Sequence, residues 1–165
     1  MQLPGYDELR ANVARANEAV DPTAILLADH EWLRFLLDYY HSLIGQADRL
    51  SETREAIETL RPRLELHIRR EEEVYFPAVE PFVLASGRGS TVDMYGEHDA
   101  IRIRIDELLM ALGSQSNAAK AYGAFSRSLL NHFDNEEELV FTDAPQQLSM
   151  EARAEILGGF RRLEE

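Results

Sequence analysis

Two short stretches of the chain each place a histidine four residues before a glutamate. A single histidine precedes each pair, by 37 residues in the first case and by 34 in the second. Residues i and i+4 lie on the same face of a helix, so each pair presents an imidazole and a carboxylate together. Where four helices surround a common interior, such side chains converge on one point. The pattern therefore predicts a metal site, and indicates two metals, with the ligands His30, His67, Glu71, His98, His132 and Glu136.

The helical period selects one acid from each run of three glutamates, residues 71–73 and 136–138. Glu71 and Glu136 each share a face with apolar residues spaced three or four positions apart, and the acids that follow them turn away. A carboxylate on a buried face is costly unless it is paired or binds a metal. We therefore expect the remaining four acids to form a solvated surface: Glu72, Glu73, Glu137 and Glu138.

Simpler explanations exist for each part of this pattern. A lone histidine is more often a core or surface residue than a ligand, and a His-x-x-x-Glu pair can be an ion pair on a helix surface. A metal-free bundle that binds a partner is a third alternative. Six polar groups in one core would, without a metal, leave buried donors and acceptors unsatisfied. The metal site is therefore the favoured interpretation.

The chemistry of the ligands narrows the choice of metal. Imidazole and carboxylate without thiolate suit iron, manganese or zinc, and six ligands exceed the tetrahedral set of zinc. Divided over two metals, they give two histidines to each, with both glutamates free to bridge. A bridging oxo or hydroxo group would make each metal five-coordinate and leave one octahedral position open. A small ligand such as dioxygen, nitric oxide or peroxide would bind there.

Composition argues against several other classes of partner and site. The chain has 165 residues, 45% of them hydrophobic and 28% charged, which fits one globular domain with its own core. A formal net charge of −13 disfavours nucleic acid and anionic membranes as partners. The absence of cysteine excludes disulfides, thiolate zinc sites and cysteine-ligated iron–sulfur clusters. No signal peptide or membrane span is evident, so we expect a cytoplasmic protein.

The elements that must position the ligands are helices. Between sparse glycines and prolines the apolar residues recur every three or four positions, and no segment alternates as a strand would. We therefore predict an all-α chain. Short connections favour antiparallel neighbours, which gives an up-down-up-down four-helix bundle with short additional N- and C-terminal helices. The expected helices span about 6–20, 22–44, 51–78, 94–113, 116–140 and 149–163.

Several residues mark the ends of these helices. Asp21, followed by proline, and Ser51 and Ser149 are the expected N-caps, and Gly45 is an expected stop. Residues 86–90, rich in glycine and serine, form the clearest loop.

The helix that contains His67 carries three prolines. Pro62 is expected to kink it or to move its start, and Pro77 and Pro81 to bend or end it. Its inner face is expected to continue past Glu71 through Val74 and Ala78.

With four histidines and two glutamates in this order, the chain resembles the hemerythrin-like proteins that carry the HHE cation-binding domain. The resemblance covers about residues 21–142. It implies a four-helix bundle that holds a non-heme diiron centre, with the four histidines as terminal ligands and the two glutamates as bridges. We therefore expect one hemerythrin-like domain over 1–165, with a core bundle at about 21–143. The motifs that carry the resemblance are Asp29-His30-Glu31, His67-x-x-x-Glu71-Glu72 with Tyr75-Phe76-Pro77, Glu97-His98-Asp99, and His132-x-x-x-Glu136-Glu137.

Two departures from that family bear on function. Oxygen-carrying hemerythrins have a fifth histidine ligand, whereas the remaining histidine here, His41, lies off the inner face and is expected at the surface. Both metals would then be accessible, which favours reactivity or sensing over oxygen carriage. The iron–sulfur repair branch has an extra N-terminal domain with a cysteine motif, and this chain has no cysteine.

The sequence thus predicts a non-heme diiron protein that binds or reacts with a small diatomic or peroxide ligand. The alternative is an iron-binding module for storage, delivery or sensing without turnover. Two iron ions are the expected cofactor, with manganese or a mixed centre as alternatives. The electron donor is undefined, and the chain is expected to be a monomer or small homo-oligomer. Tyr75 and Tyr95 are expected to pack in the core, the alternative being a hydrogen bond to a metal-bound oxygen.

Overall fold

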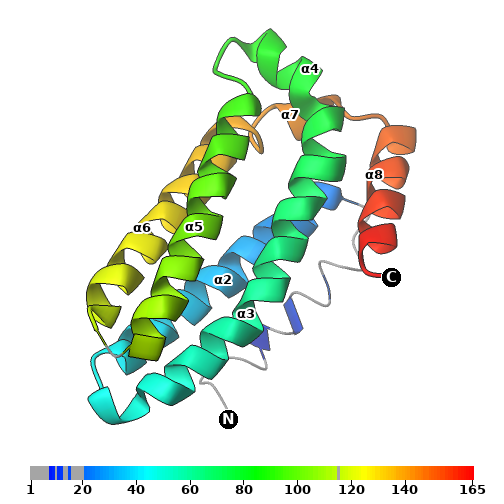
Figure 1. The fold of residues 1–165 in the computed structure, drawn as a ribbon. Coiled ribbons are helices and arrows are strands. Elements are labelled where there is room, and N and C mark those ends of the chain that lie inside the picture. Colours follow the sequence, from blue (N-terminus) through cyan, green and yellow to red (C-terminus); the bar gives the residue numbers. More distant parts are fainter. Residues whose placement is uncertain (1–7, 10, 13–14, 16–20, 115) are drawn as a thin grey trace.

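The computed structural model describes residues 8–9, 11–12, 15, 21–114 and 116–165. Within these ranges the regular structure is helical and no residue is in a strand, so the all-α prediction is confirmed. Four long helices dominate the molecule (Figure 1): α2 (Pro22–Ile44), α3 (Leu50–Arg70), α5 (Val92–Ser114) and α6 (Ala118–Leu139).

The four long helices form a closed ring. Helix α5 packs against α6 and α3, and α2 packs against α3 and α6. Short connections join α2 to α3 and α5 to α6, so the two members of each pair run antiparallel (Figure 1). This is the expected up-down-up-down bundle, and its interior is the place where four inward faces meet.

Local signals explain several helix ends. The Asp21 carboxylate accepts a hydrogen bond from the Thr23 N–H at 3.1 Å, and Gly45 ends α2. Ser149 caps α8 (Met150–Leu163) in the same way. The predicted cap at Ser51 is wrong. A 3-10 turn, Ala47–Arg49, runs straight into α3, so Ser51 falls within the first turn of the helix.

None of the three prolines ends the helical stretch. Pro62 lies inside α3 without moving its start. After α3 comes a π-helical segment, η2 (Glu71–Tyr75), and then α4 (Phe76–Ser86), which contains both Pro77 and Pro81. Pro77 falls in the first turn of α4, directly after the π-helical segment. The helical stretch therefore ends only at Gly87, which adopts a left-handed φ of 71°.

The π-helical segment shifts the buried face by one position. Val74 and Ala78 were expected to point inward, but both are partly exposed, whereas Tyr75 and Val79 are fully buried. One extra residue in a turn rotates every later side chain by about 100° around the helix axis. The expected inner face is thus correct up to Glu71 and wrong beyond it.

Two further helices lie at one end and one side of the bundle. The short α7 (Ala144–Gln147) packs against α4, and the C-terminal α8 packs against α3, η2 and α2 (Figure 1). None of the described helices combines the length and apolar character needed to cross a membrane. The predicted N-terminal helix over 6–20 falls largely outside the described residues, of which those within it are helical: Glu8, Leu9, Ala11, Asn12 and Arg15.

The apolar core is divided into two clusters. One fills the bundle between the four long helices and includes Leu33 and Leu64, and the other lies under α4, α7 and α8 and includes Leu26 and Phe76. His30 sits between Leu26 and Leu33 on α2, so a polar layer separates the two clusters. The functional candidates lie in that layer.

Candidate metal centre

The bundle brings all six predicted ligands together in its interior. His30 comes from α2, His67 from α3 and His98 from α5, while Glu71 opens the π-helical segment. The remaining two, His132 and Glu136, come from α6. All six side chains are between 0% and 2% exposed.

The six side chains form two overlapping groups. One consists of His30 and His67 with both glutamates, and the other of His98 and His132 with the same glutamates. Within each group the candidate ligand atoms lie within 4.8 Å of one another. Because Glu71 and Glu136 belong to both groups, their carboxylates would be shared by the two cations if each group held one.

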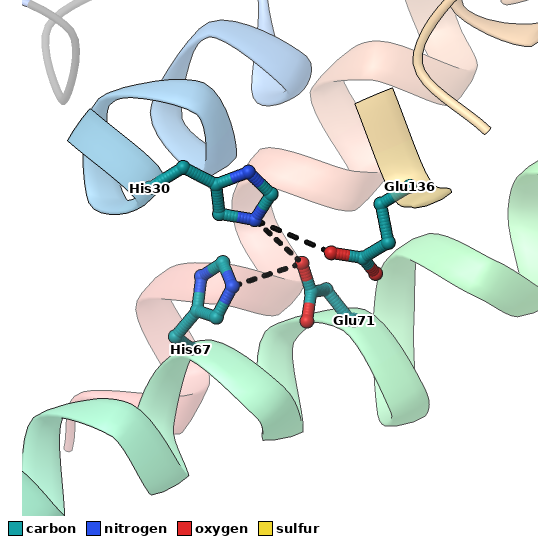
Figure 2. Close-up of side chains that lie close together, drawn as sticks. All are labelled: His30, His67, Glu71 and Glu136. Carbon is teal, nitrogen blue, oxygen red and sulfur yellow. Dashed lines mark ion pairs between the residues drawn. The ribbon is translucent and has the colours of Figure 1, made fainter. Parts of the chain in front are cut away.

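Each histidine turns its Nε2 atom toward a glutamate. Figure 2 shows the first group, in which His30 Nε2 lies 3.2 Å from Glu136 Oε2 and His67 Nε2 lies 3.1 Å from Glu71 Oε1. In the second group His98 Nε2 lies 3.3 Å from Glu71 Oε2. His132 Nε2 lies 3.2 Å from Glu136 Oε2. Four ring nitrogens and two carboxylates thus face one small volume.

Several of these buried atoms have no hydrogen-bond partner. They are Nε2 of His30 and His67 and both carboxylate oxygens of Glu71 and Glu136. Leaving such groups unsatisfied costs about 1–3 kcal/mol each, and more where they are charged. A cation bound by nitrogen and oxygen would satisfy them all, and this donor set suits iron, manganese or zinc. The residues present therefore fit a metal pair.

The opposite nitrogen of each histidine donates to an acid. The Nδ1–H group of every ring meets a carboxylate oxygen on a neighbouring helix, at 2.8–3.3 Å. This contact fixes the tautomer that leaves Nε2 free to bind a metal, and it holds the ring in place. The four pairs are His30 with Glu137, His67 with Asp29, His98 with Glu72, and His132 with Glu97.

Two of these acids were wrongly expected to be solvated. Glu72 is only 19% exposed and Glu137 34%, and each contacts a histidine across a helix interface. A residue next to an inward-facing one points to the flank of its helix, and in a closed bundle the flank faces another helix. The exposed positions of Glu73 and Glu138 agree with the expectation. Sequence reasoning did not find Asp29 and Glu97, although each directly precedes a single histidine.

A third layer of side chains holds the acids. Arg34 donates to Glu137 at 2.7 Å, Arg70 donates to Asp29 at 2.8 Å, and Arg102 donates to Glu72 at 3.0 and 3.1 Å. The fourth acid, Glu97, accepts instead from the Asn135 amide at 2.7 Å. Three guanidinium groups and one neutral amide thus complete the surroundings of the four histidines.

Protons compete with a cation for this site. Burial lowers the pKa of His98 to about 2, and the charge of His132 adds to that shift. Burial opposes charge on His132 as well, but Glu136 and Glu97 outweigh it and raise the pKa of that ring to about 9. Their Nε2 atoms lie 2.9 Å apart, so a protonated His132 would donate a hydrogen bond to His98 in the metal-free chain.

One of the two buried glutamates, Glu71, adds to this effect. Burial and the nearby charge of Glu136 raise the pKa of Glu71 well above its usual range. A cation would have to displace the protons held by Glu71 and His132.

The two tyrosines and the fifth histidine considered in the sequence do not take part in the cluster of six buried side chains. The Tyr75 hydroxyl bonds to Thr23 Oγ1 at 2.7 Å, and the Tyr95 hydroxyl donates to the Glu72 carbonyl at 3.2 Å. Both hydroxyls therefore have protein partners, and neither supports the alternative role at a metal-bound oxygen. His41 is exposed, as expected.

Comparison with known families agrees with this geometry. A sequence model of the hemerythrin HHE cation-binding domain matches residues 21–144. The chain belongs to the hemerythrin HHE family. The match contains the whole four-helix bundle and all six converging residues, whereas the C-terminal helix α8 of this HHE protein lies beyond it. No curated protein and no solved structure matches the chain significantly.

Proposed function

We propose that the chain binds two iron ions at the polar layer of the bundle and reacts there with a small ligand such as dioxygen, nitric oxide or peroxide. The observation that carries the proposal is that two groups of four buried ligands share Glu71 and Glu136. Membership of a cation-binding family supports it. In this proposal His30 and His67 hold one iron, and His98 and His132 hold the other.

A redox-active metal pair would supply electrons to a bound small molecule. The protein would hold the ligating side chains in place and keep bulk water away from them. Ring contacts restrict the histidines. His30 stacks on Phe133, with centroids 4.0 Å apart, and His98 lies parallel to Phe76 at 5.8 Å. Both phenylalanines are fully buried, so they also keep bulk water from the ligands. A site this enclosed favours small ligands over extended organic substrates.

The ligand set favours reactivity or sensing over oxygen carriage. Each metal position draws on two histidines and two shared glutamates, and the chain's fifth histidine, His41, is exposed. Neither position is therefore saturated by protein ligands. This absence of a fifth histidine ligand supports a role in which both positions can bind a small molecule.

A sensing role without turnover is the second candidate. Arg70 donates both to Asp29, the acid that holds His67, and to Glu164 at the C-terminal end of α8. A change in the position of His67 would thus be transmitted to a helix at the side of the bundle. The electron donor and a cytoplasmic location remain predictions.

Metal content and reactivity test the proposal. Protein purified without added metal, and protein reconstituted with ferrous iron under anaerobic conditions, should contain two irons per chain. Exposure to oxygen or nitric oxide should then change its near-ultraviolet and visible absorption. Substantially fewer than two irons per chain would contradict the proposal. Two irons without any reaction would favour the sensing or storage role.

A further inference from the structure

The two halves of the bundle repeat one another. The segment from His67 to Phe76 has a counterpart of the same length, ten residues, from His132 to Phe141. In both, the carbonyl of the inner glutamate accepts a hydrogen bond from the N–H of the phenylalanine five residues later. Each phenylalanine packs against the single histidine of the other half: Phe76 on His98, and Phe141 on His30.

The surrounding charges follow the same repeat. Arg34 lies four residues after His30 and donates to Glu137, the acid that faces His30. Arg102 lies four residues after His98 and donates to Glu72, which faces His98. Each of these arginines thus neutralises the acid that accepts a hydrogen bond from the histidine one turn earlier on the same helix.

One position breaks the repeat. Arg70 lies three residues after His67 and donates to Asp29, the acid that faces His67. The equivalent position after His132 is Asn135, whose neutral amide donates to Glu97. Among the described residues, the only ion pair of Glu97 is the one with His132.

This difference makes the two metal positions unequal. Around His30 and His67, both outer acids are neutralised by arginine, whereas around His98 and His132 only one is. Arg34 and Arg70 each meet one further acid, Asp134 and Glu164, and Arg102 meets two, Glu65 and Asp99. These outer contacts therefore do not cancel the difference. An imidazole that donates to an unneutralised carboxylate is a stronger donor to a metal.

We infer that the position formed by His98 and His132 binds a divalent cation more tightly than the position formed by His30 and His67, and that Asn135 sets this order. The inference rests on the proposed metal centre. Asn135 acts through Glu97 and His132 and is therefore a positioning residue. Because Asn135 is partly exposed, a longer side chain can reach solvent from it without entering the core.

Zinc titration of the full metal-free chain tests the inference, at a pH above the pKa of His132 of about 9, so that the proton on that ring does not compete with the first cation. In nitrogen-15 spectra of the histidine side chains, the first equivalent of Zn²⁺ should shift Nε2 of His98 and His132. The second equivalent should shift His30 and His67. The opposite order, or simultaneous filling of both positions, would overturn the inference. Failure to bind two equivalents would instead overturn the proposed metal centre itself.

Variants separate charge from structure at this position. Asn135→Arg should lower the affinity of the tighter position by about tenfold and remove the order of filling. Asn135→Gln retains a neutral amide and should keep the order. Arg34→Gln offers an independent route, because it leaves Glu137 unneutralised and should strengthen the His30 position relative to the other. An unchanged order in both Asn135→Arg and Arg34→Gln would overturn the role of these charges.

Discussion

The Glu137 carboxylate accepts a hydrogen bond from His30 Nδ1 at 2.8 Å, on the side of the ring opposite the inner glutamates. Hydrogen bonds from His30 and Arg34 lower the pKa of Glu137 to about 2, so this acid stays charged at physiological pH. It can therefore orient the ring and strengthen Nε2 as a ligand at the same time.

Removing this outer acid should weaken metal binding without removing a ligand. We expect Glu137→Ala to lower metal affinity by about tenfold to a hundredfold, measured by competition with a chromogenic chelator. Glu138→Ala is the matched control, because Glu138 is the exposed neighbour and should leave the affinity unchanged. Equal effects of the two substitutions would show that Glu137 acts only through general charge.

Loss of an inner glutamate should destabilise only the metal-loaded form of the protein. Glu71→Ala removes a bridge, so the metal content should fall below two per chain and the metal-loaded form should melt at a lower temperature. In the metal-free form it removes two unsatisfied buried oxygens, so the melting temperature should not fall.

Elemental analysis and thermal melts with and without chelator would measure both effects of Glu71→Ala, with the exposed Glu73→Ala as control. Unchanged metal content and melting temperature in Glu71→Ala would favour a metal-free bundle.

Metal affinity should rise with pH. In the metal-free chain the pKa of His132 is raised to about 9, and that of Glu71 is raised well above its usual range. Both groups hold protons that a metal must displace, so lowering the pH favours the metal-free form. Calorimetric titrations in buffers with different ionisation enthalpies should detect proton release on binding. A pH-independent affinity between about pH 6 and 8 would be inconsistent with these proton-bound ligands.

The contact between α8 and the π-helical segment can be tested with two adjacent glycines. A Cβ at Gly159 would lie 2.5 Å from Val74 Cγ1, so Gly159→Ala should destabilise the fold by about 1–3 kcal/mol. At Gly158 a Cβ would meet only the flexible end of Arg162 at 3.5 Å, so Gly158→Ala should be neutral or slightly stabilising. Denaturant unfolding followed by circular dichroism would compare them, and equal stability of the two variants would contradict the close packing of α8.

The convergence of the candidate ligands could be predicted because their positions on each helix depend only on the local helical period. His67 and Glu71 share a face whichever helices surround them, and so do His132 and Glu136. The flanking acids could not be predicted in this way. Whether Glu72 meets water or His98 depends on which helix lies beside α3, and that neighbour is set by tertiary packing.

The π-helical segment is a second feature that could not be predicted from the sequence. A regular period places Val74 inward, but the wide turn at Glu71 moves Tyr75 into that place. No residue type in the segment predicts such a turn. The charge difference at Asn135 is visible in the sequence, but its meaning depends on the contact with Glu97, which only the folded bundle provides.

The candidate ligands are divided between two helical hairpins, the first formed by α2 and α3 and the second by α5 and α6, and this division has a mechanical consequence. Each metal position takes its histidines from one hairpin and a glutamate from each, so bound cations would tie the first hairpin to the second. From His30 to Glu136 such a tie closes a loop of about a hundred residues, the length at which a cross-link restricts an unfolded chain strongly. In a protein without cysteine, the metal pair would thus take the place of a disulfide, one that chelation reverses without any change in redox conditions.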